Sequence, residues 1–336
     1  MNLFWSKQHK SAHRAEKLPG LFTRVWSKLL ISALLLLSHH SNTFGYVRTT
    51  SPDGTPIYWH RSCIFISPDS AGSSDVGAEA SLEAVTAGTE EWNYAASECN
   101  SYIKFIVNDP KPNLKRGFTT NGTNKNVIVW LEENWGDDEI DYERNAIAIS
   151  TITFVSDPGA EDDGEILDAD IEFNGVYQEF SASSQGEAGK YDIRNTLTHE
   201  LGHVLGLDHP CHDGEVEPRP VDHEGNPIPD CYPAWSLDDS ITEATMYNFA
   251  LTGETKKRYL ADDDIEGLCA IYPPGDDPDV CAPISFRPQG CSCRHISKHK
   301  NPTPVTVLVF SLLGLLGFLR LFLREHSSNI SGGSKE

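Results

Sequence analysis

The chain has 336 residues, of which 39% are hydrophobic, 10% aromatic and 23% charged, and this composition indicates an ordinary globular protein with enough length for one sizeable core. The formal net charge is −22 at pH 7, and residues 46–290 alone hold 15 basic against 46 acidic residues. An acidic surface of that size repels nucleic acid and anionic membranes, so it excludes a nucleic-acid-binding function.

Residues 1–45 predict a segment that directs export. Basic side chains precede the apolar run Leu29–Leu37, which is too short to span a bilayer comfortably. We therefore expect a secretory signal peptide with a cleavage site near Gly45, although no A-x-A sequence marks the site. An uncleaved N-terminal anchor is the alternative. The basic residues are Lys7, Lys10, Arg14, Lys17, Arg24 and Lys28.

Residues 46–274 predict one α+β domain, in which helices lie across a twisted mixed sheet. Glu79–Ser97 is expected to form the first long helix, because apolar residues recur along it at steps of three and four. Segments rich in β-branched and aromatic residues are expected to form strands. These segments are Pro56–Trp59, Cys63–Ile66, Tyr102–Val107, Asn126–Leu131, Ala146–Phe154 and Ile166–Phe173.

The last of these strands carries a row of carboxylates. Asp168, Asp170 and Glu172 fall on one face of the strand and apolar side chains on the other, because side chains alternate along a strand. Calcium prefers carboxylate oxygens, so these three residues are a candidate calcium site. An acidic sheet edge that binds no ion and discourages aggregation is the alternative.

The stretch from His199 to His209 predicts a metal site. His199 and His203 lie one turn apart on a helix for which Asp192 is a suitable N-cap. Gly206 can end that helix in a left-handed turn, and the chain can then return to deliver His209 as a third ligand. Three imidazoles with one open position are typical of catalytic zinc, whereas structural zinc uses four protein ligands. A helix with solvated histidines is the alternative.

The pattern HExxHxxGxxH at residues 199–209 resembles the metzincin zinc peptidases. This family also has a methionine turn, and Ala244–Asn248 matches it with Met246 followed by Tyr247, as in the matrixin branch. The resemblance covers residues 60–273 and implies that Met246 forms an apolar floor beneath the three imidazoles. It also implies that Glu200 is the general base, which accepts the proton of the attacking water during peptide hydrolysis.

The same resemblance makes residues 166–173 the edge strand that pairs with an extended substrate. Matrixins have a histidine where Asp170 stands, so the resemblance does not extend to a second, structural zinc. The chain is expected to close the domain with a helix that begins at Asp262, has a capping box formed by Asp263 and Glu266, and ends before Pro273.

Six cysteines between Cys63 and Cys281 are expected to form three disulfides, because disulfides are the default in an exported protein. Pairing of sequence neighbours is one of fifteen connectivities, and it gives Cys63–Cys99, Cys211–Cys231 and Cys269–Cys281. The middle pair would restrain the long loop 210–245, which separates the histidines from the methionine turn.

The chain ends in a three-part pattern. A stalk rich in Pro and Ser at 275–304 contains Cys291-Ser292-Cys293, the apolar segment 305–323 is long enough to cross a bilayer, and the tail 324–336 begins with Arg324. This arrangement resembles the MYXO-CTERM sorting tails of surface-anchored bacterial proteins, and a plain single-pass anchor is the alternative. Both place the catalytic part outside the cytoplasm.

The sequence thus predicts an exported, cell-surface zinc endopeptidase that acts on proteins or peptides and is held in the membrane by its C-terminal segment. One catalytic zinc is the expected cofactor, with calcium as a candidate second ion, and no nucleic-acid partner is expected. One alternative is a catalytically silent surface adhesion or recognition module with the same fold. Another is a zinc enzyme that acts on a non-peptide amide.

Overall fold

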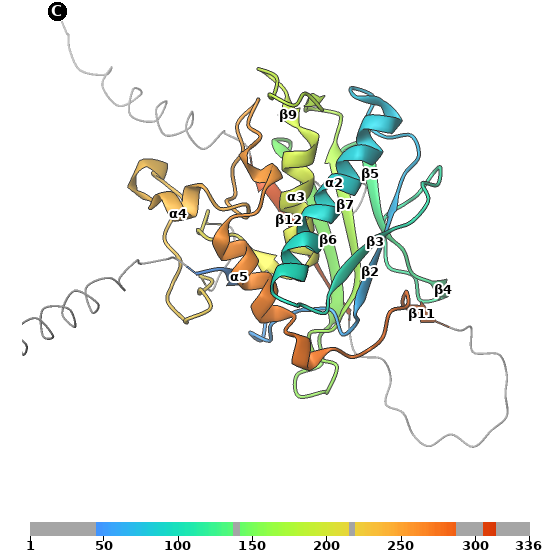
Figure 1. Ribbon diagram of the computed structural model, residues 1–336, viewed down its shortest axis with the longest axis vertical. Helices are drawn as coiled ribbons and strands as arrows, with labels where there is room; N and C mark the ends of the chain where they lie inside the picture. The colour runs from blue at the N-terminus through green and yellow to red at the C-terminus, as the bar shows by residue number, and fades with distance from the viewer. Residues whose placement is uncertain (1–44, 137–141, 215–218, 287–304, 314–336) are drawn as a thin grey trace, which may run out of the picture. The chain divides into compact units, whose positions relative to one another are not determined.

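A six-stranded mixed sheet lies at the centre of the fold (Figure 1). The computed structural model describes residues 45–136, 142–214, 219–286 and 305–313, all within one unit that spans residues 44–336. The strands β3, β2, β5 and β7 are parallel, β6 is antiparallel to β7, and β12 is antiparallel to β6. In sheet order the strands are β12 (Val305–Leu313), β6 (Ala146–Val155), β7 (Ile166–Asn174), β5 (Asn126–Leu131), β2 (Cys63–Pro68) and β3 (Lys104–Val107).

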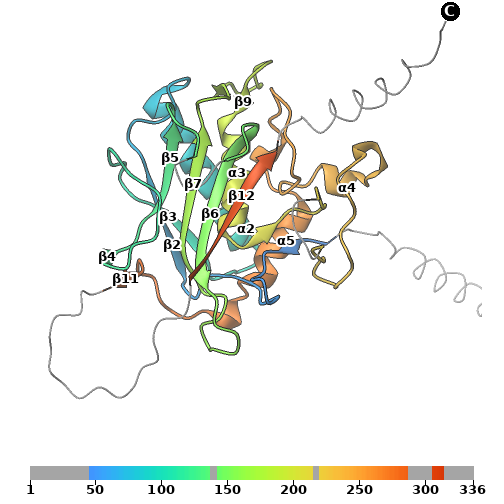
Figure 2. The same ribbon diagram turned by 180° about the vertical axis from the view of Figure 1, so that it is seen from behind.

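Two helices, α2 (Gly77–Glu98) and α3 (Ile193–Val204), cover one face of this sheet, and Figure 2 shows the sheet from the opposite side. The indole N–H of Trp92 in α2 donates to the carbonyl oxygen of Thr198 in α3 at 2.9 Å. Gly88 lets the helices approach closely, since a Cβ there would lie 3.3 Å from side-chain atoms of Leu197 and Leu201. α3 packs against α2 on one side and against β6 of the sheet, and these contacts fix its position, as a helix that carries a functional site requires.

Short elements complete the domain. β1 (Val47–Arg48) pairs with β10 (Leu207–Asp208), β4 (Gly122–Thr123) pairs with β11 (Ser285–Phe286), and β8 (Phe180–Ser181) pairs with β9 (Tyr191–Asp192). The remaining helices are α4 (Asp239–Thr242), α5 (Asp262–Ile271) and the 3₁₀ turns η1 (Ala234–Ser236), η2 (Lys256–Arg258) and η3 (Pro274–Asp276).

The predicted combination of a mixed sheet and helices is confirmed, and the ends of most predicted elements shift by only one or two residues. Pro56–Trp59 is the exception, because it forms only isolated bridges. Pro56 pairs with Thr50 and Tyr58 pairs with Glu165, so this segment joins two different neighbours and continues along neither.

The prediction that residues 166–173 form a sheet edge is wrong. β7 lies between β5 and β6 and is hydrogen-bonded to both. Its two faces separate as predicted, but Asp168, Asp170 and Glu172 are as deeply buried as the apolar residues opposite. A period of two shows which side chains share a face, and it does not show what covers that face.

Of the three predicted disulfides, Cys211–Cys231 is confirmed and the other two are wrong. Cys63 at the start of β2 is bonded to Cys281, and Cys99, directly after α2, is bonded to Cys269 in α5. Neighbour pairing fails here because the fold packs the end of α2 against α5 and returns the chain after α5 to β2.

The two ends of the chain lie mostly outside the described residues. This holds for residues 1–44, 287–304 and 314–336, and so for the predicted signal or anchor and for Cys291-Ser292-Cys293. Residues 305–313 of the predicted span form β12 along β6. Within the described ranges, no helix has the length and apolarity to cross a membrane.

Candidate metal centre

The helix α3 positions the first two histidines. Its N-cap is Asp192, as predicted, and the carboxylate accepts from the N–H of Asn195 at 2.7 Å. The carboxylate of Asp192 also forms an ion pair with Arg258, which ties the start of α3 to η2. Apolar side chains fix the helix from the other side, and all of them are fully buried: Leu197, Leu201, Val204 and Leu205.

The chain then turns sharply and brings in the third histidine. Gly206 has φ +85°, and a Cβ at this position would lie 2.6 Å from the carbonyl oxygen of Ile57, so only glycine fits. After the turn, Nε2 of His209 lies 3.1 Å from Nε2 of His203 and 3.3 Å from Nε2 of His199. Among the described residues, these three histidines are the one group of His, Cys, Asp or Glu arranged to hold a metal ion.

The two separations from Nε2 of His209 fit zinc, and the ligand nitrogens of all three histidines lie within 4.8 Å of one another. A tetrahedral ion with Zn–N bonds of about 2.0–2.1 Å spaces its ligand nitrogens by roughly 3.3–3.4 Å. Nδ1 of His199 lies 2.7 Å from the carbonyl oxygen of Thr245, and Nδ1 of His203 lies 3.0 Å from that of Leu207. A carbonyl can only accept, so each Nδ1 carries the proton and each Nε2 presents a lone pair.

Burial keeps these imidazoles neutral. It lowers the pKa of His203 to about 3 and lowers the pKa values of His199 and His209 well below their ordinary range. The buried ammonium of Lys257 adds to each of these shifts by charge repulsion. Neutral imidazole is the form that binds a metal, so no proton has to leave at neutral pH.

Glu200 has one fixed and one free carboxylate oxygen. Ser150 of β6 donates its hydroxyl to Oε2 of Glu200 at 2.7 Å. Oε1 is buried and has no hydrogen-bond partner among the described residues. Burial raises the pKa of Glu200 to about 8, and the Ser150 hydrogen bond and the charge of Lys257 oppose that rise. A fully buried oxygen without a partner is costly unless a ligand or water uses it, which is what a general base requires.

Met246 packs beneath the histidine helix. A Cβ on Gly202 would lie 2.2 Å from Sδ of Met246, so glycine at this position lets the methionine sulfur reach α3 between the two helical histidines. Asp264 fixes the methionine turn by accepting from the N–H groups of Thr245 at 2.7 Å and Met246 at 3.2 Å. The predicted capping box at Asp263 and Glu266 is wrong: α5 has Ala261 as its N-cap and no side-chain cap.

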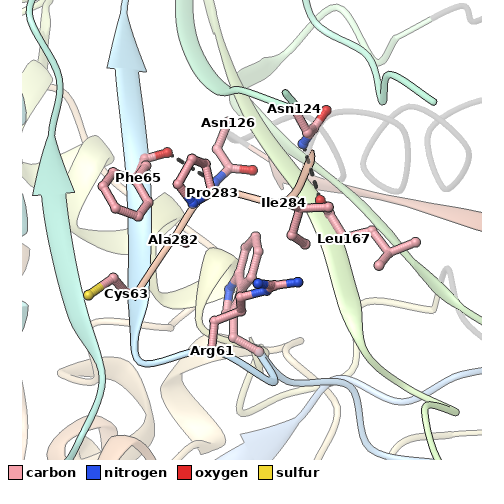
Figure 3. A pocket seen from close by; sticks show the side chains of 10 residues that line it. Arg61, Cys63, Phe65, Asn124, Asn126, Leu167, Ala282, Pro283 and Ile284 are labelled. Atoms are coloured by element: carbon pink, nitrogen blue, oxygen red, sulfur yellow. Dashed lines mark hydrogen bonds between the residues drawn. The ribbon is translucent and has the colours of Figure 1, made fainter. Parts of the chain in front are cut away.

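The candidate calcium residues are not among the groups of the described residues that could hold a metal ion. Asp168 accepts from the amide nitrogen of Asn124 at 2.6 Å. The same nitrogen donates to the carbonyl oxygen of Leu167, as Figure 3 shows. Asp170 accepts from the backbone N–H groups of Gly117 and Val127, and Glu172 accepts from the hydroxyl of Tyr142. Because each carboxylate has its own protein donors, the row on β7 is a buried polar network.

Asp168→Asn is expected to stabilise the protein at pH 7.5 by about 1–3 kcal/mol. Burial raises the pKa of Asp168 to about 6, so this carboxyl favours folding below its ordinary pKa of 3.8, and that contribution is lost as the pH rises through about 6. Asparagine keeps the oxygen that accepts from Asn124 and avoids the loss. Thermal unfolding from pH 4 to pH 8 tests this, with a gain that disappears near pH 4. If calcium stabilised the unsubstituted protein and did not stabilise the variant, an ion bound at β7 would be supported instead.

The pocket in Figure 3 lies elsewhere in the molecule. Phe65, Asn124, Asn126 and Ile284 are among the residues that line it, and none of the three histidines does. This pocket is therefore separate from the histidine cluster.

Sequence reasoning missed Ser150, Asp264, Lys257 and the partner of His209, which is Asn248. Ser150 is 50 positions from Glu200, and no local pattern marks it. The Nζ of Lys257 donates to the carbonyl oxygen of Tyr247, and burial lowers the pKa of this ammonium to about 8. Buried lysines are rare, so the burial of Lys257 marks it as unusual, but the sequence alone does not show that burial.

Ser150→Ala is expected to move the acidic limb of the pH–activity profile to higher pH by about one unit. The hydroxyl stabilises the ionised form of Glu200, so its removal raises the pKa of Glu200 and a larger fraction is protonated at a given pH. The dependence of kcat/KM on pH measures the shift. An unchanged acidic limb would show that Glu200 is not the titrating base or that Ser150 does not act on it.

The described part is thus a mixed α/β protein whose three converging histidines could hold a metal ion. No protein-family model matches the chain. No curated protein matches it either. Among solved structures it is similar to the "Structure of Myroilysin", with a TM-score of 0.31 and 13% sequence identity over 70% of this chain and 93% of that chain.

Proposed function

We propose that this protein is a zinc-dependent endopeptidase of the metzincin type, close to the matrixin branch. The observation that carries the proposal is the joint geometry of α3. Nε2 of His209 lies at separations from the other two imidazole nitrogens that suit tetrahedral zinc, and Glu200, next to His199, keeps one carboxylate oxygen free. An ion held by three protein ligands would keep a fourth position for water, and a free carboxylate beside that position is the arrangement of a hydrolytic site.

His199, His203 and His209 would hold the ion, which supplies a Lewis acid that polarises a peptide carbonyl and makes water more acidic. Ser150 orients Glu200 through Oε2, so that Oε1 can accept the proton of the attacking water. Glu200 then returns this proton to the leaving amine. A nearby dication favours the ionised carboxylate, so zinc offsets the burial that raises the Glu200 pKa.

We further propose that the protein is exported and held at the cell surface by residues 305–323, with proteins or peptides as its substrates. In the anchored form residues 305–313 would leave β6, with which they pair as β12 in this structure. Three disulfides in the described residues support an oxidising compartment. The acidic composition of residues 46–290 supports a soluble extracellular part that does not bind nucleic acid.

The test uses the full chain, purified in detergent. Elemental analysis is expected to find one zinc per chain, and the protein is expected to cleave casein until a chelator removes the metal. A library of proteome-derived peptides, digested with and without chelator, would then define the side-chain preference. Stoichiometric zinc with no hydrolysis of any peptide would favour the silent adhesion module, and release of acetate from acetylated substrates without peptide cleavage would favour a deacetylase.

A further inference from the structure

The side chain of Asn248 lies next to Nδ1 of His209, the ring nitrogen that does not face the other two histidines. Its side-chain amide nitrogen lies 3.0 Å from Nδ1 of His209, and its amide oxygen lies 3.1 Å from Sγ of Cys211 and 3.4 Å from Sγ of Cys231. Asn248 and both cysteines are buried. The amide is therefore held between an imidazole on one side and a disulfide on the other.

The orientation of this amide follows from the hydrogens available around it. Turning an amide by 180° exchanges its oxygen and nitrogen without changing its shape. Disulfide sulfurs carry no hydrogen, so Cys211 and Cys231 cannot donate to an oxygen that faces them. In the turned orientation the oxygen accepts from Nδ1–H of His209, and the nitrogen faces the sulfurs, which are weak acceptors. This orientation also places the amide oxygen, in place of the nitrogen, 3.3 Å from the carboxylate of Asp213. Asp213 is partly exposed, so water can hydrate its carboxylate and screen this contact.

The turned orientation also matches the other two imidazoles. Thr245 and Leu207 present carbonyl oxygens to Nδ1 of His199 and His203, and these oxygens leave Nε2 free of hydrogen. Both are backbone groups, which no substitution of a side chain removes. His209 lies beyond the end of α3 and has a side chain as its acceptor instead, so the third position depends on residue 248.

We propose that Asn248 is the positioning residue that orients His209 for metal binding, and that the Cys211–Cys231 disulfide packs against the Asn248 amide and holds it in place. The proposal rests on the zinc site proposed above. If so, metal retention depends on the redox state of the Cys211–Cys231 disulfide, because reduction would separate the two sulfurs against which the Asn248 amide packs. Groups around a ligating histidine typically change metal affinity by about 10- to 100-fold.

Two substitutions of similar size separate positioning from packing. Asn248→Leu fills the same space without an acceptor and is expected to weaken zinc binding by about 10- to 100-fold. Asn248→Asp keeps an acceptor for Nδ1–H and is expected to bind zinc within about threefold of the unsubstituted protein. Zinc affinity is measured on the full chain by competition with a chromophoric chelator. A role in packing alone predicts the reverse order, since leucine suits a buried site and a buried carboxylate does not.

The disulfide has a matched control in the same chain. The double variant Cys211→Ala/Cys231→Ala is expected to bind zinc about tenfold more weakly, and Cys99→Ala/Cys269→Ala, which opens the bond between α2 and α5, is expected to bind it normally. Equal zinc affinities of the two double variants would overturn the role of the disulfide. Equal zinc affinities of Asn248→Leu and Asn248→Asp would overturn the role of Asn248. If the unsubstituted chain binds no zinc in this assay, the proposed function itself fails.

Discussion

Replacing Glu200 by glutamine is expected to lower kcat/KM for peptide hydrolysis by about 10²- to 10⁴-fold while the protein keeps its zinc. Glutamine retains an oxygen that can accept from the hydroxyl of Ser150, so the shape of the site and this contact remain. Its amide cannot take a proton from water, and the step that depends on Oε1 is lost. Hydrolysis of a fluorogenic peptide and elemental analysis of the same sample measure the two effects separately.

Glu98→Gln is the matched control, because this carboxylate is exposed at the end of α2. Stability supplies a second check. Burial raises the pKa of Glu200 to about 8, so in the zinc-free protein this group favours folding below its ordinary pKa, and the contribution is lost as the pH rises through about 8. Zinc-free E200Q is therefore expected to unfold at or above the temperature of the unsubstituted protein at pH 8. Hydrolysis at the normal rate would remove Glu200 from the mechanism.

The parts of the site that the sequence predicts are those encoded locally. His199 and His203 are four positions apart, and helix geometry alone places them on one face. Asp192 and Gly206 mark the two ends of the same helix by their own backbone chemistry, and the structure finds a cap and a positive φ at these positions. Each of these inferences needs no more than a turn or two of chain.

The parts that the sequence does not predict depend on which segments the sheet brings together. Ser150 reaches Glu200 because β6 packs against α3, and the alternation of side chains in β6 does not reveal this contact. The carboxylates of β7 are grouped correctly on one face and assigned wrongly to an exposed edge, because the strand order of the sheet decides exposure. The sequence around Asp264 predicts only the start of a helix. The folded chain shows in addition that the Asp264 carboxylate accepts hydrogen bonds from the methionine turn.

The disulfides also divide into one that local sequence predicts and two that depend on the overall fold. Cys211 and Cys231 lie in one loop and pair with each other, so proximity in sequence suffices. The other two bonds span 218 and 170 positions and report the closure of the whole domain. In the chain-entropy account, long loops gain more from cross-linking than short ones, so these two bonds are expected to contribute more to stability than Cys211–Cys231. The short bond is the one that contacts the residue behind His209, and its role is therefore better sought in the metal centre.

Replacing His203 by alanine is expected to abolish hydrolysis and to remove the dependence of stability on zinc. In the unsubstituted protein, zinc binds the folded state and is expected to raise its stability by about 4 kcal/mol at a free concentration 1,000 times Kd. His203 supplies one of three ligand nitrogens that lie within 4.8 Å of one another, so its loss leaves two ligands and an incomplete site. Thermal unfolding with zinc and with chelator measures the difference between the two proteins.

His223→Ala is the control for this measurement, because His223 is exposed and stacks on Tyr46 away from the cluster. It is expected to keep the full zinc-dependent rise in Tm. Burial lowers the pKa of His203 to about 3, so the neutral ring favours folding above its ordinary pKa, and that neutral form is complete at pH 7. The zinc-free H203A protein is therefore expected to differ from the zinc-free parent only through the lost packing of the ring and its lost hydrogen bond to the carbonyl oxygen of Leu207. If H203A retained the same zinc-dependent shift as the parent, the ion would have to be held somewhere other than α3, and the proposed peptidase mechanism would have no metal at its centre.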